Sequence, residues 1–230
     1  GFCSASENYI SNLKVRYPVI HNIPAATITF GTFMPDTKIA ADNRHEFKSL
    51  LQPEFKNIVY IGRGGNDMHK AISPVFGTLK KGLSLQPELF SKIKFYFIGT
   101  SYAPKGQGSA TILSLAQQYG VENNVTEITD RISYYHSLIT LMQADALFIP
   151  GSDDPQYTAS KIYPYLLTQK PLLAIFNKNS SAVEILNNCT KNATILTFDE
   201  EQQSLIDKLY QLMHQWENNI FSPVSLAKNF

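Results

Sequence analysis

The chain has few cysteines and no long apolar segment. Only two cysteines occur in 230 residues, Cys3 and Cys189, and they lie far apart in the sequence. Two isolated thiols form neither a cysteine-based metal-binding pattern nor a disulfide framework. Free cysteines are typical of a reducing compartment, and a cytoplasmic protein is therefore expected. No apolar run approaches the roughly 20 residues that a helix needs to cross a bilayer, so no transmembrane segment is predicted.

The chain also lacks an excess of charge of either sign. The formal net charge is +1 at pH 7, from 20 basic and 19 acidic residues, and no basic block stands out. Proteins that bind nucleic acid or an anionic membrane by electrostatics carry a clear excess of basic residues. We therefore expect no nucleic-acid partner.

What is present is a regular hydrophobic pattern that begins near residue 57. Short continuous apolar runs alternate with stretches in which apolar residues recur at helical spacing. Continuous apolar strands are typical of parallel sheets that are covered on both faces. We predict an α/β fold, with a Rossmann-like, mostly parallel six-stranded sheet flanked by helices. The expected strands are Asn57–Gly62, Ile93–Gly99, Val125–Thr129, Asp145–Pro150, Pro171–Phe176 and Ala193–Phe198. The expected helices are Asp67–Lys81, Gly108–Tyr119, Tyr134–Gln143, Ser160–Thr168, Ser180–Asn187 and Glu200–Glu217.

Residues 1–56 lack this alternation. Ser6–Tyr17 has the spacing of an amphipathic helix, and Thr27–Phe33 is rich in β-forming residues. Pro35–Pro53 is polar and charged, like a linker. The pattern divides the chain into a small N-terminal part, 1–56, and a main domain, 57–230.

A strand, a polar loop and a capped helix follow one another in the second half of the chain. Ala144–Pro150, apolar except for Asp145, is typical of a buried strand, Gly151–Ala159 is polar, and Ser160 can cap the helix that follows. Such a junction presents backbone N–H groups to which an anion can bind. Lys161 lies in the first turn, where a cation is unfavourable for the helix dipole. A bound phosphate would explain its presence.

A second candidate anion site is the glycine-rich loop after the first strand of the main domain. Gly62, Gly64 and Gly65 let a ligand approach the backbone, and Arg63 and Lys70 supply positive charge. The order of residues matches neither the dinucleotide fingerprint nor the P-loop. A plain glycine turn beside two solvated cations is the alternative interpretation.

These features together resemble the retaining GT-B glycosyltransferases of the family 4 type, which use nucleotide-sugar donors. That family has a pair of glutamates eight positions apart, and Gln156 and Pro164 stand in their place here. The residues that match the family's donor-domain pattern are Asp145, Pro150, Ser152, Ser160, Lys161, Tyr165, Leu166, Lys170 and Pro171. The residues that follow the order at the end of the family's first domain are Ser4, Tyr9, Leu13, Arg16, Tyr17, Ile23 and Pro24.

The resemblance implies that the chain is the C-terminal half of a GT-B fold. Residues 57–230 would form the nucleotide-sugar-binding domain, and residues 1–56 the tail of an otherwise absent N-terminal acceptor domain plus the linker. The residues expected around the donor diphosphate are Gly62, Arg63, Gly64, Gly65, Lys70, Ser160 and Lys161. Ile132 and Ser133 would contact the base, although their loop could equally serve only to cap the helix Tyr134–Gln143. Asp153, Asp154, Gln156 and Tyr157 would line the donor sugar and ribose, although the two aspartates could equally serve only to keep the loop soluble.

The activity implied by the resemblance is transfer of a sugar, of the hexosyltransferase kind, from a nucleotide sugar to an acceptor hydroxyl with retention of configuration. No metal or other cofactor is expected, and this fragment alone is expected to be inactive. The base, the sugar, the acceptor, the catalytic residues and the oligomeric state stay open. One alternative is a non-catalytic nucleotide-sugar-binding domain, which Gln156 and Pro164 favour. Another is a GT-B sugar-nucleotide epimerase, which would need a carboxylate and histidine set that the sequence does not show.

Overall fold

A computed structural model describes residues 1–154, 157 and 161–227 of the chain. Its centre is one six-stranded sheet in the order β5-β4-β3-β6-β7-β9, in which every neighbouring pair is parallel. The strands are β3 (Lys56–Ile61), β4 (Ile93–Ile98), β5 (Val125–Ile128), β6 (Ala146–Pro150), β7 (Leu172–Phe176) and β9 (Thr194–Thr197). The predicted α/β fold with a parallel six-stranded sheet is confirmed, and each strand lies within two residues of its expected bounds.

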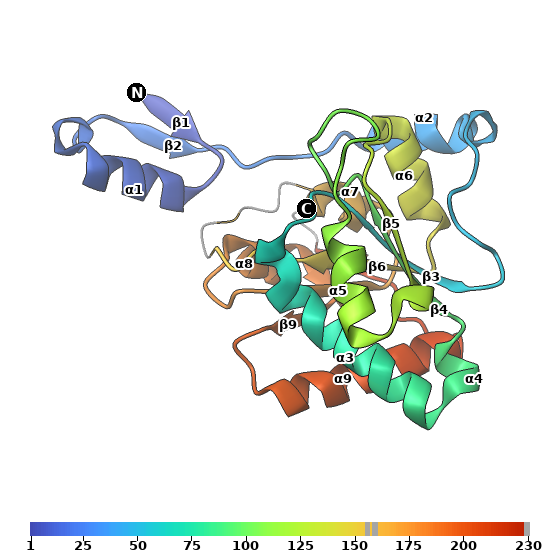
Figure 1. Cartoon of the computed structure of the whole chain (residues 1–230). Helices are drawn as coiled ribbons and strands as arrows, with labels where there is room; N and C mark the ends of the chain where they lie inside the picture. The colour runs from blue at the N-terminus through green and yellow to red at the C-terminus, as the bar shows by residue number, and fades with distance from the viewer. Residues whose placement is uncertain (155–156, 158–160, 228–230) are drawn as a thin grey trace.

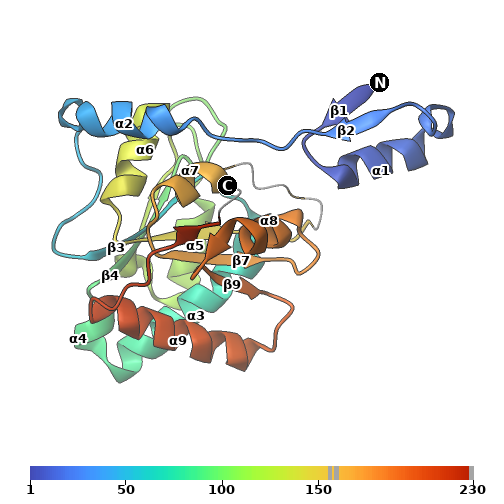
Figure 2. The same ribbon diagram turned by 180° about the vertical axis from the view of Figure 1, so that it is seen from behind.

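Helices cover both faces of the sheet (Figures 1 and 2). On one face lie α3 (His69–Leu85), α4 (Pro87–Phe90), α5 (Thr111–Tyr119) and α9 (Gln202–Glu217). On the other lie α6 (Tyr134–Gln143), α7 (Ile162–Leu167) and α8 (Ser181–Cys189). Short strands β8 (Thr190–Lys191) and β10 (Ser225–Leu226) pair near the C-terminus. In the described part of the chain, no helix is long and apolar enough to cross a membrane.

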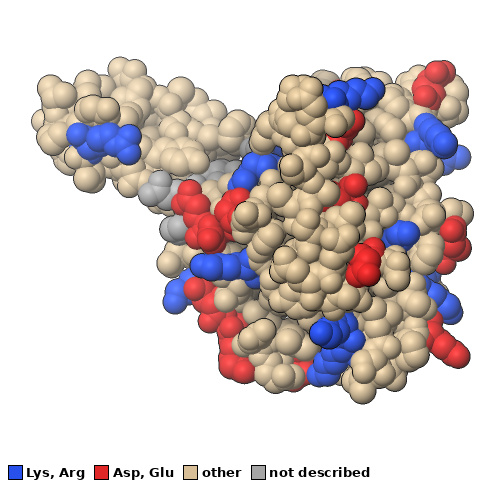
Figure 3. All heavy atoms as spheres, viewed as in Figure 1, with Lys and Arg blue, Asp and Glu red and all other residues tan. Residues whose placement is uncertain are grey.

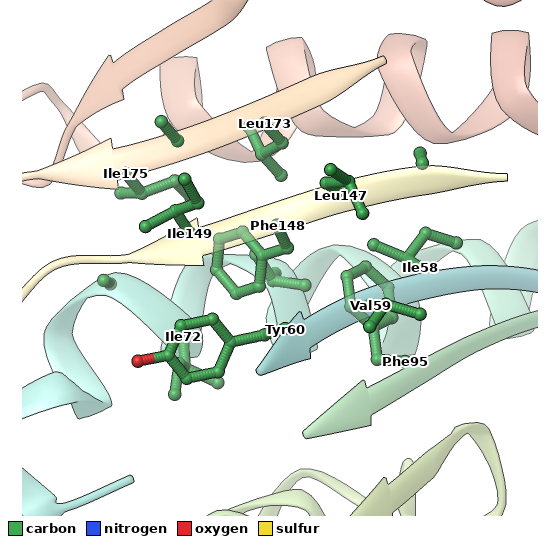
Figure 4. Packing of buried hydrophobic residues seen from close by; sticks show 14 of the residues in the cluster. Ile58, Val59, Tyr60, Ile72, Phe95, Leu147, Phe148, Ile149, Leu173 and Ile175 are labelled. Atoms are coloured by element: carbon green, nitrogen blue, oxygen red, sulfur yellow. The ribbon is translucent and has the colours of Figure 1, made fainter. Parts of the chain in front are cut away.

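The core forms where side chains of the central strands meet the helices. Each residue of β6 and β7 is buried, which is why their sequences are continuous apolar runs. The rings of Phe95 and Phe148, both labelled in Figure 4, pack edge to face with centroids 6.0 Å apart. On the face that α3 covers, the ring of Phe76 in α3 meets that of Phe97 in β4 edge to face, with centroids 6.1 Å apart.

The strand order reverses between β3 and β6, because the chain runs outward through β4 and β5 on one side and through β7 and β9 on the other. Crevices at the carboxyl ends of strands beside such a reversal are where open α/β sheets bind ligands. The ladder between β3 and β6 is also short and pairs only Ile58 with Ala146 and Val59 with Leu147.

A tyrosine hydroxyl fills the place where this ladder stops. If the register continued, the carbonyl of Ile61 would face the nitrogen of Pro150, which has no N–H to donate. The buried hydroxyl of Tyr165 in α7 replaces the missing strand partner. It accepts a hydrogen bond from the N–H of Ile61 at 2.6 Å and donates one to the Ile61 carbonyl at 3.0 Å. Burial raises the pKa of Tyr165, so the hydroxyl stays protonated and able to donate.

We therefore expect Tyr165→Phe to be strongly destabilising. It would leave a buried N–H and a buried C=O of Ile61 without partners, at an estimated total cost of about 2–4 kcal/mol. Urea unfolding of the variant and the wild type measures the loss. Tyr210→Phe, which removes the hydroxyl of a half-buried tyrosine stacked on Phe90, is the matched control and should change stability little. Equal stability of Tyr165→Phe and the wild type would contradict this account of the strand end.

The N-terminal segment forms a small unit that projects from the main body (Figures 1 and 2). Strands β1 (Phe2–Ser4) and β2 (Ala25–Thr27) are parallel, and α1 (Glu7–Arg16) connects them. The expected helix is therefore present. The expected β-rich run Thr27–Phe33 is not a strand beyond its first residue; residues 28–33 form the extended connection to the main body.

The segment expected to be a polar linker contains a helix instead. Helix α2 (Met34–Asp42) packs against α6, and Ala40 is buried with Leu138 and Ile139. The carboxylate of Asp36 accepts hydrogen bonds from the hydroxyls of Tyr134 and Tyr135 at 3.1 and 3.4 Å. The high polarity of this segment hid a single apolar contact face, which is sufficient to dock a short helix.

Candidate functional site

The candidate site lies at the carboxyl ends of β3 to β6, where four loops meet beside the reversal in strand order. These loops follow β3, β4, β5 and β6 and contain, respectively, Arg63, Tyr102, Arg131 and Asp153. Elsewhere on the face drawn in Figure 3, basic and acidic side chains are interspersed without a large patch of one sign. The site therefore has to be judged from individual contacts.

The glycines after β3 are explained by close packing within the protein. A Cβ atom at Gly62 would lie 2.4 Å from the hydroxyl of Tyr60, and one at Gly64 would lie 2.8 Å from Cβ of Thr100. The N–H groups of Gly62 and Gly64 donate to the carbonyls of Ile98 and Thr100, at 2.9 and 2.8 Å. These two N–H groups therefore hold the loop against β4, and the loop's attraction for an anion rests mainly on its side chains.

Arg63 is fixed in position at both ends. Its carbonyl accepts a hydrogen bond of 2.9 Å from the buried Tyr60 hydroxyl. Its guanidinium donates to both carboxylate oxygens of Asp67, at 2.8 and 2.5 Å. The ring of Tyr157 lies 5.6 Å from Cζ of Arg63, within the range of a cation–π contact. Arg63 and Tyr157, both predicted site residues, are thus neighbours.

Asp67 connects two of the loops. In addition to the two bonds from Arg63, it accepts a hydrogen bond of 2.6 Å from the hydroxyl of Ser152 in the loop after β6. Its backbone carbonyl accepts from the N–H of Asp153 at 2.8 Å. The hydrogen bonds from Arg63 lower the pKa of Asp67 to about 2, with a smaller contribution from Ser152. The pKa of Arg63 is raised by the same pairing.

This lowered pKa predicts a specific pH dependence. The folded value of about 2 lies below the roughly 3.9 of an unfolded aspartate, so the contribution of Asp67 to stability is fully present above about pH 4. It is lost as the pH falls through about 2. We expect Asp67→Asn to be less stable than the wild type at pH 7, and the difference to shrink towards zero between about pH 4 and 2. Urea unfolding of both proteins across this pH range measures the difference in stability. A difference that does not change with pH would contradict the lowered pKa of Asp67.

The other predicted phosphate-binding cations have different surroundings. The ammonium of Lys70 lies 3.8 Å from the carboxylate of Asp153, and both groups are largely exposed. Lys161 immediately precedes α7, and its pKa is lowered by partial burial and by the nearby charge of Arg131. The guanidinium of Arg131 in turn lies over the ring of Tyr102, 4.1 Å from the centroid.

A small pocket links Lys161 to the end of β3. It has a volume of about 140 Å³ and lies between α6 and α7. Its lining includes Ile61, Tyr134, Lys161, Pro164 and Tyr165. Lys161 thus lies beside Ile61, the last residue of β3, and Arg63 follows Ile61 by two residues in the sequence.

The remaining predicted residues are placed as follows. Ile132 is half-buried and packs against the main core. The hydroxyl of Ser133 caps α6 by accepting from the N–H of His136 at 3.3 Å. Asp153 and Asp154 lie in the loop after β6, while Gln156 and Ser160 lie outside the residues that the structure describes.

Sequence reasoning missed Asp67 as a site residue. Its spacing of four residues from Arg63 was a usable signal, since oppositely charged residues at that spacing pair on a helix. Here the pair spans a loop and a short 3₁₀ turn, Asn66–Met68, so the helical rule alone would not have supported it. Among the described residues, no group of three histidine, cysteine or acidic side chains is arranged to hold a metal ion.

A larger and more polar cleft lies between the N-terminal unit and α8. Its volume is about 790 Å³, and most of its lining side chains are neutral and polar, among them Asn8, Thr27, Ser181 and Asn187. It is close to the loop after β6, because the hydroxyl of Ser180 at its edge donates to the carbonyl of Tyr157 at 3.3 Å.

No family model matches the sequence, and no curated protein matches it significantly. The structure, in contrast, is similar to solved glycosyltransferases. It matches WaaG, a glycosyltransferase involved in lipopolysaccharide biosynthesis, with a TM-score of 0.58 and 14% identity, over 95% of this chain and 56% of that one. A glycosyltransferase from Rickettsia africae matches with a TM-score of 0.56 and 13% identity, over 96% of this chain and 59% of that one.

A UDP-forming α,α-trehalose-phosphate synthase from Burkholderia vietnamiensis also matches, with a TM-score of 0.55 and 10% identity, over 95% of this chain and 54% of that one. The chain thus spans little more than half the length of each of these three proteins. The TM-scores establish a shared fold, and identities this low establish nothing beyond the fold. The chain has the Rossmann-like architecture found in GT-B glycosyltransferases.

Proposed function

We propose that this chain is the nucleotide-sugar-binding part of a glycosyltransferase, which transfers a sugar to an acceptor hydroxyl. The observation that carries the proposal is the position of Arg63 and Lys161 near the carboxyl end of β3, beside the reversal in strand order. The glycosyltransferase fold supports it. Among similar structures, the pneumococcal O-GlcNAc transferase GtfA was solved in complex with UDP and GlcNAc.

In this proposal the basic side chains bind the donor diphosphate. Arg63 offers a planar set of N–H donors to phosphate oxygens, and Lys161 and Lys70 act as point charges. Negative charge builds up on the nucleoside diphosphate as the bond to the sugar breaks, and fixed cations stabilise that charge. Gly62, Gly64 and Gly65 shape the loop that presents Arg63, while Ser160 belongs to the same predicted set.

The other predicted contacts surround this centre. Ile132 and Ser133 would lie near the base, and Asp153, Asp154, Gln156 and Tyr157 near the sugar and ribose. Retention of configuration and hexose specificity are carried over from the resemblance to the family. No other cofactor is needed in this scheme, and no catalytic residue is assigned.

The acceptor side is proposed to involve the N-terminal unit. Two three-residue parallel strands with one helix are too small to be stable alone, and parallel sheets are normally covered on both faces. Apolar side chains of this unit also face solvent; Val15 and Val19 are 80% and 88% exposed. We therefore propose that residues 1–56 belong to an acceptor domain and its linker, and that the acceptor approaches through the 790 Å³ cleft.

One observation favours a second candidate, a binding domain without catalytic activity. Pro164 lines the small pocket beside Lys161, at a position where the resembling family has a glutamate. A proline supplies no carboxylate to hydrogen-bond a ribose or sugar hydroxyl. In this second candidate the donor binds without being turned over, and activity therefore has to be tested apart from binding.

Calorimetric titration of the chain with UDP, GDP and ADP, and then with their sugar conjugates, tests the proposal. Saturable binding of one nucleoside diphosphate is expected, because the cations act on the shared diphosphate and the base decides between the three. If none of the three binds at millimolar concentration, the proposed function is wrong for both candidates.

A further inference from the structure

The proposed diphosphate site contains a carboxylate whose presence needs an explanation. Asp67 lies directly against Arg63, the residue expected to bind phosphate, and negative charge there opposes an incoming anion. Yet Asp67 accepts two hydrogen bonds from Arg63 and a third from Ser152, and is one of the most extensively bonded side chains described at the site. Its low pKa keeps it charged over the whole physiological range.

The geometry leaves Arg63 able to serve two partners. A guanidinium has five N–H donors in a rigid plane, and Asp67 occupies only one donor on each of its two terminal nitrogens. Three donors remain for another ligand. About 30% of the Arg63 side chain is exposed, so these donors are not sealed from solvent.

The loop is also built around the pair. A Cβ atom at position 65 would lie 2.6 Å from Oδ1 of Asp67 and 3.1 Å from Nη1 of Arg63. The backbone of Gly65 is extended, with φ at 175°, a conformation open to any residue. The missing side chain at position 65 is thus explained by the space that the Arg63–Asp67 pair occupies.

We propose that Asp67 is a positioning residue, which holds the Arg63 guanidinium in the orientation that receives the donor diphosphate, with Ser152 holding Asp67 in turn. The inference rests on the proposed function. In this proposal the hydrogen bond from Ser152 to Asp67 also fixes the position of the loop after β6 relative to the loop after β3.

Two effects of opposite sign decide the outcome of removing the carboxylate. Asp67→Asn removes a negative charge and so increases the attraction for an anion. It also frees the long Arg63 side chain, which must then be ordered when the ligand binds. We expect the loss of order to dominate, since Ser152 and Arg63 already neutralise and disperse the charge of Asp67.

A double-mutant cycle separates these effects, with UDP, GDP and ADP as probes in calorimetry. Asp67→Asn is expected to weaken binding of the preferred nucleotide by about fivefold to tenfold. In an Arg63→Ala background, the same change should leave affinity unchanged or slightly improved, because only the charge effect is left. Asp67→Glu keeps the carboxylate and should recover at least part of the affinity.

Several outcomes would overturn the proposal. These are Asp67→Asn binding at least as tightly as the wild type, an equal loss in the Arg63→Ala background, or Asp67→Glu binding no better than Asp67→Asn. If Asp67→Asn does not fold, Ser152→Ala is the milder probe, with an expected loss of about twofold to fivefold that also depends on Arg63. Nucleotide binding by the wild type together with any of these results rejects the role of Asp67 alone; absence of all nucleotide binding rejects the proposed function with it.

Discussion

Alanine in place of Arg63 or of Lys161 is expected to weaken nucleoside-diphosphate binding by roughly one to two orders of magnitude. Each change removes a charge-assisted contact, and one such contact contributes about 1.5–3 kcal/mol. The Arg63 variant should show the larger loss, because a guanidinium can bind two phosphate oxygens at once. Calorimetry with the preferred nucleotide measures both effects.

Lys80→Ala provides a matched control for this experiment. Lys80 is exposed on α3, about three turns beyond the start of the helix, so the change removes the same charge at a distance from the loops. Its effect on affinity should be small. Stability should fall little in the Arg63 variant, since a partly exposed ion pair contributes about 1 kcal/mol or less. Unchanged affinity in both site variants would reject the diphosphate site.

The second large effect concerns catalysis. The 230-residue chain by itself is expected to bind a nucleotide sugar and yet show negligible transfer to sugar or lipid-linked acceptors. The reason is that the proposed acceptor side is represented only by the N-terminal unit, with its two short strands and exposed apolar side chains. Release of the nucleoside diphosphate in the presence of an acceptor panel, followed by a coupled assay, measures transfer.

Binding and transfer have to be measured on the same preparation. Retained nucleotide-sugar binding without turnover is the expected combination, and it excludes a damaged donor site as the cause of inactivity. Robust transfer by the purified chain would overturn the assignment of residues 1–56 to an incomplete acceptor side. It would also reject the non-catalytic candidate that Pro164 favours.

Local patterns in the sequence were sufficient to predict the six strands of the central sheet and the longer helices of the main domain, but not the short elements α4, β8 and β10. Strands such as Ala146–Pro150 and Leu172–Phe176 are buried on both faces, and such strands are apolar at every position, which is visible without knowing their neighbours. The helix Gln202–Glu217 likewise buries Leu205 and Leu209 at helical spacing. The polar stretch around α2 concealed a helix, because its docking face includes only one fully buried side chain, Ala40.

The site was predictable only in part. Arg63 and Lys161 could be proposed from their positions after strands, because the carboxyl ends of parallel strands meet at one edge of the sheet. The packing role of the glycines could not be predicted. A Cβ at position 62 would clash with Tyr60, and that clash depends on where the tyrosine ring points. The resemblance placed Gln156 and Ser160 in the site as well, and they lie outside the described residues.

The sequence by itself determined the alternation of strands and helices, because the hydrophobic pattern of each element shows which of its faces is buried. Only the tertiary structure decided which distant groups meet. The bond between Ser152 and Asp67 joins residues 85 positions apart, and the Tyr165 hydroxyl reaches Ile61 across 104 positions. Such contacts depend on the strand order β3-β6-β7 and on the missing N–H of Pro150, and neither acts until the sheet has formed.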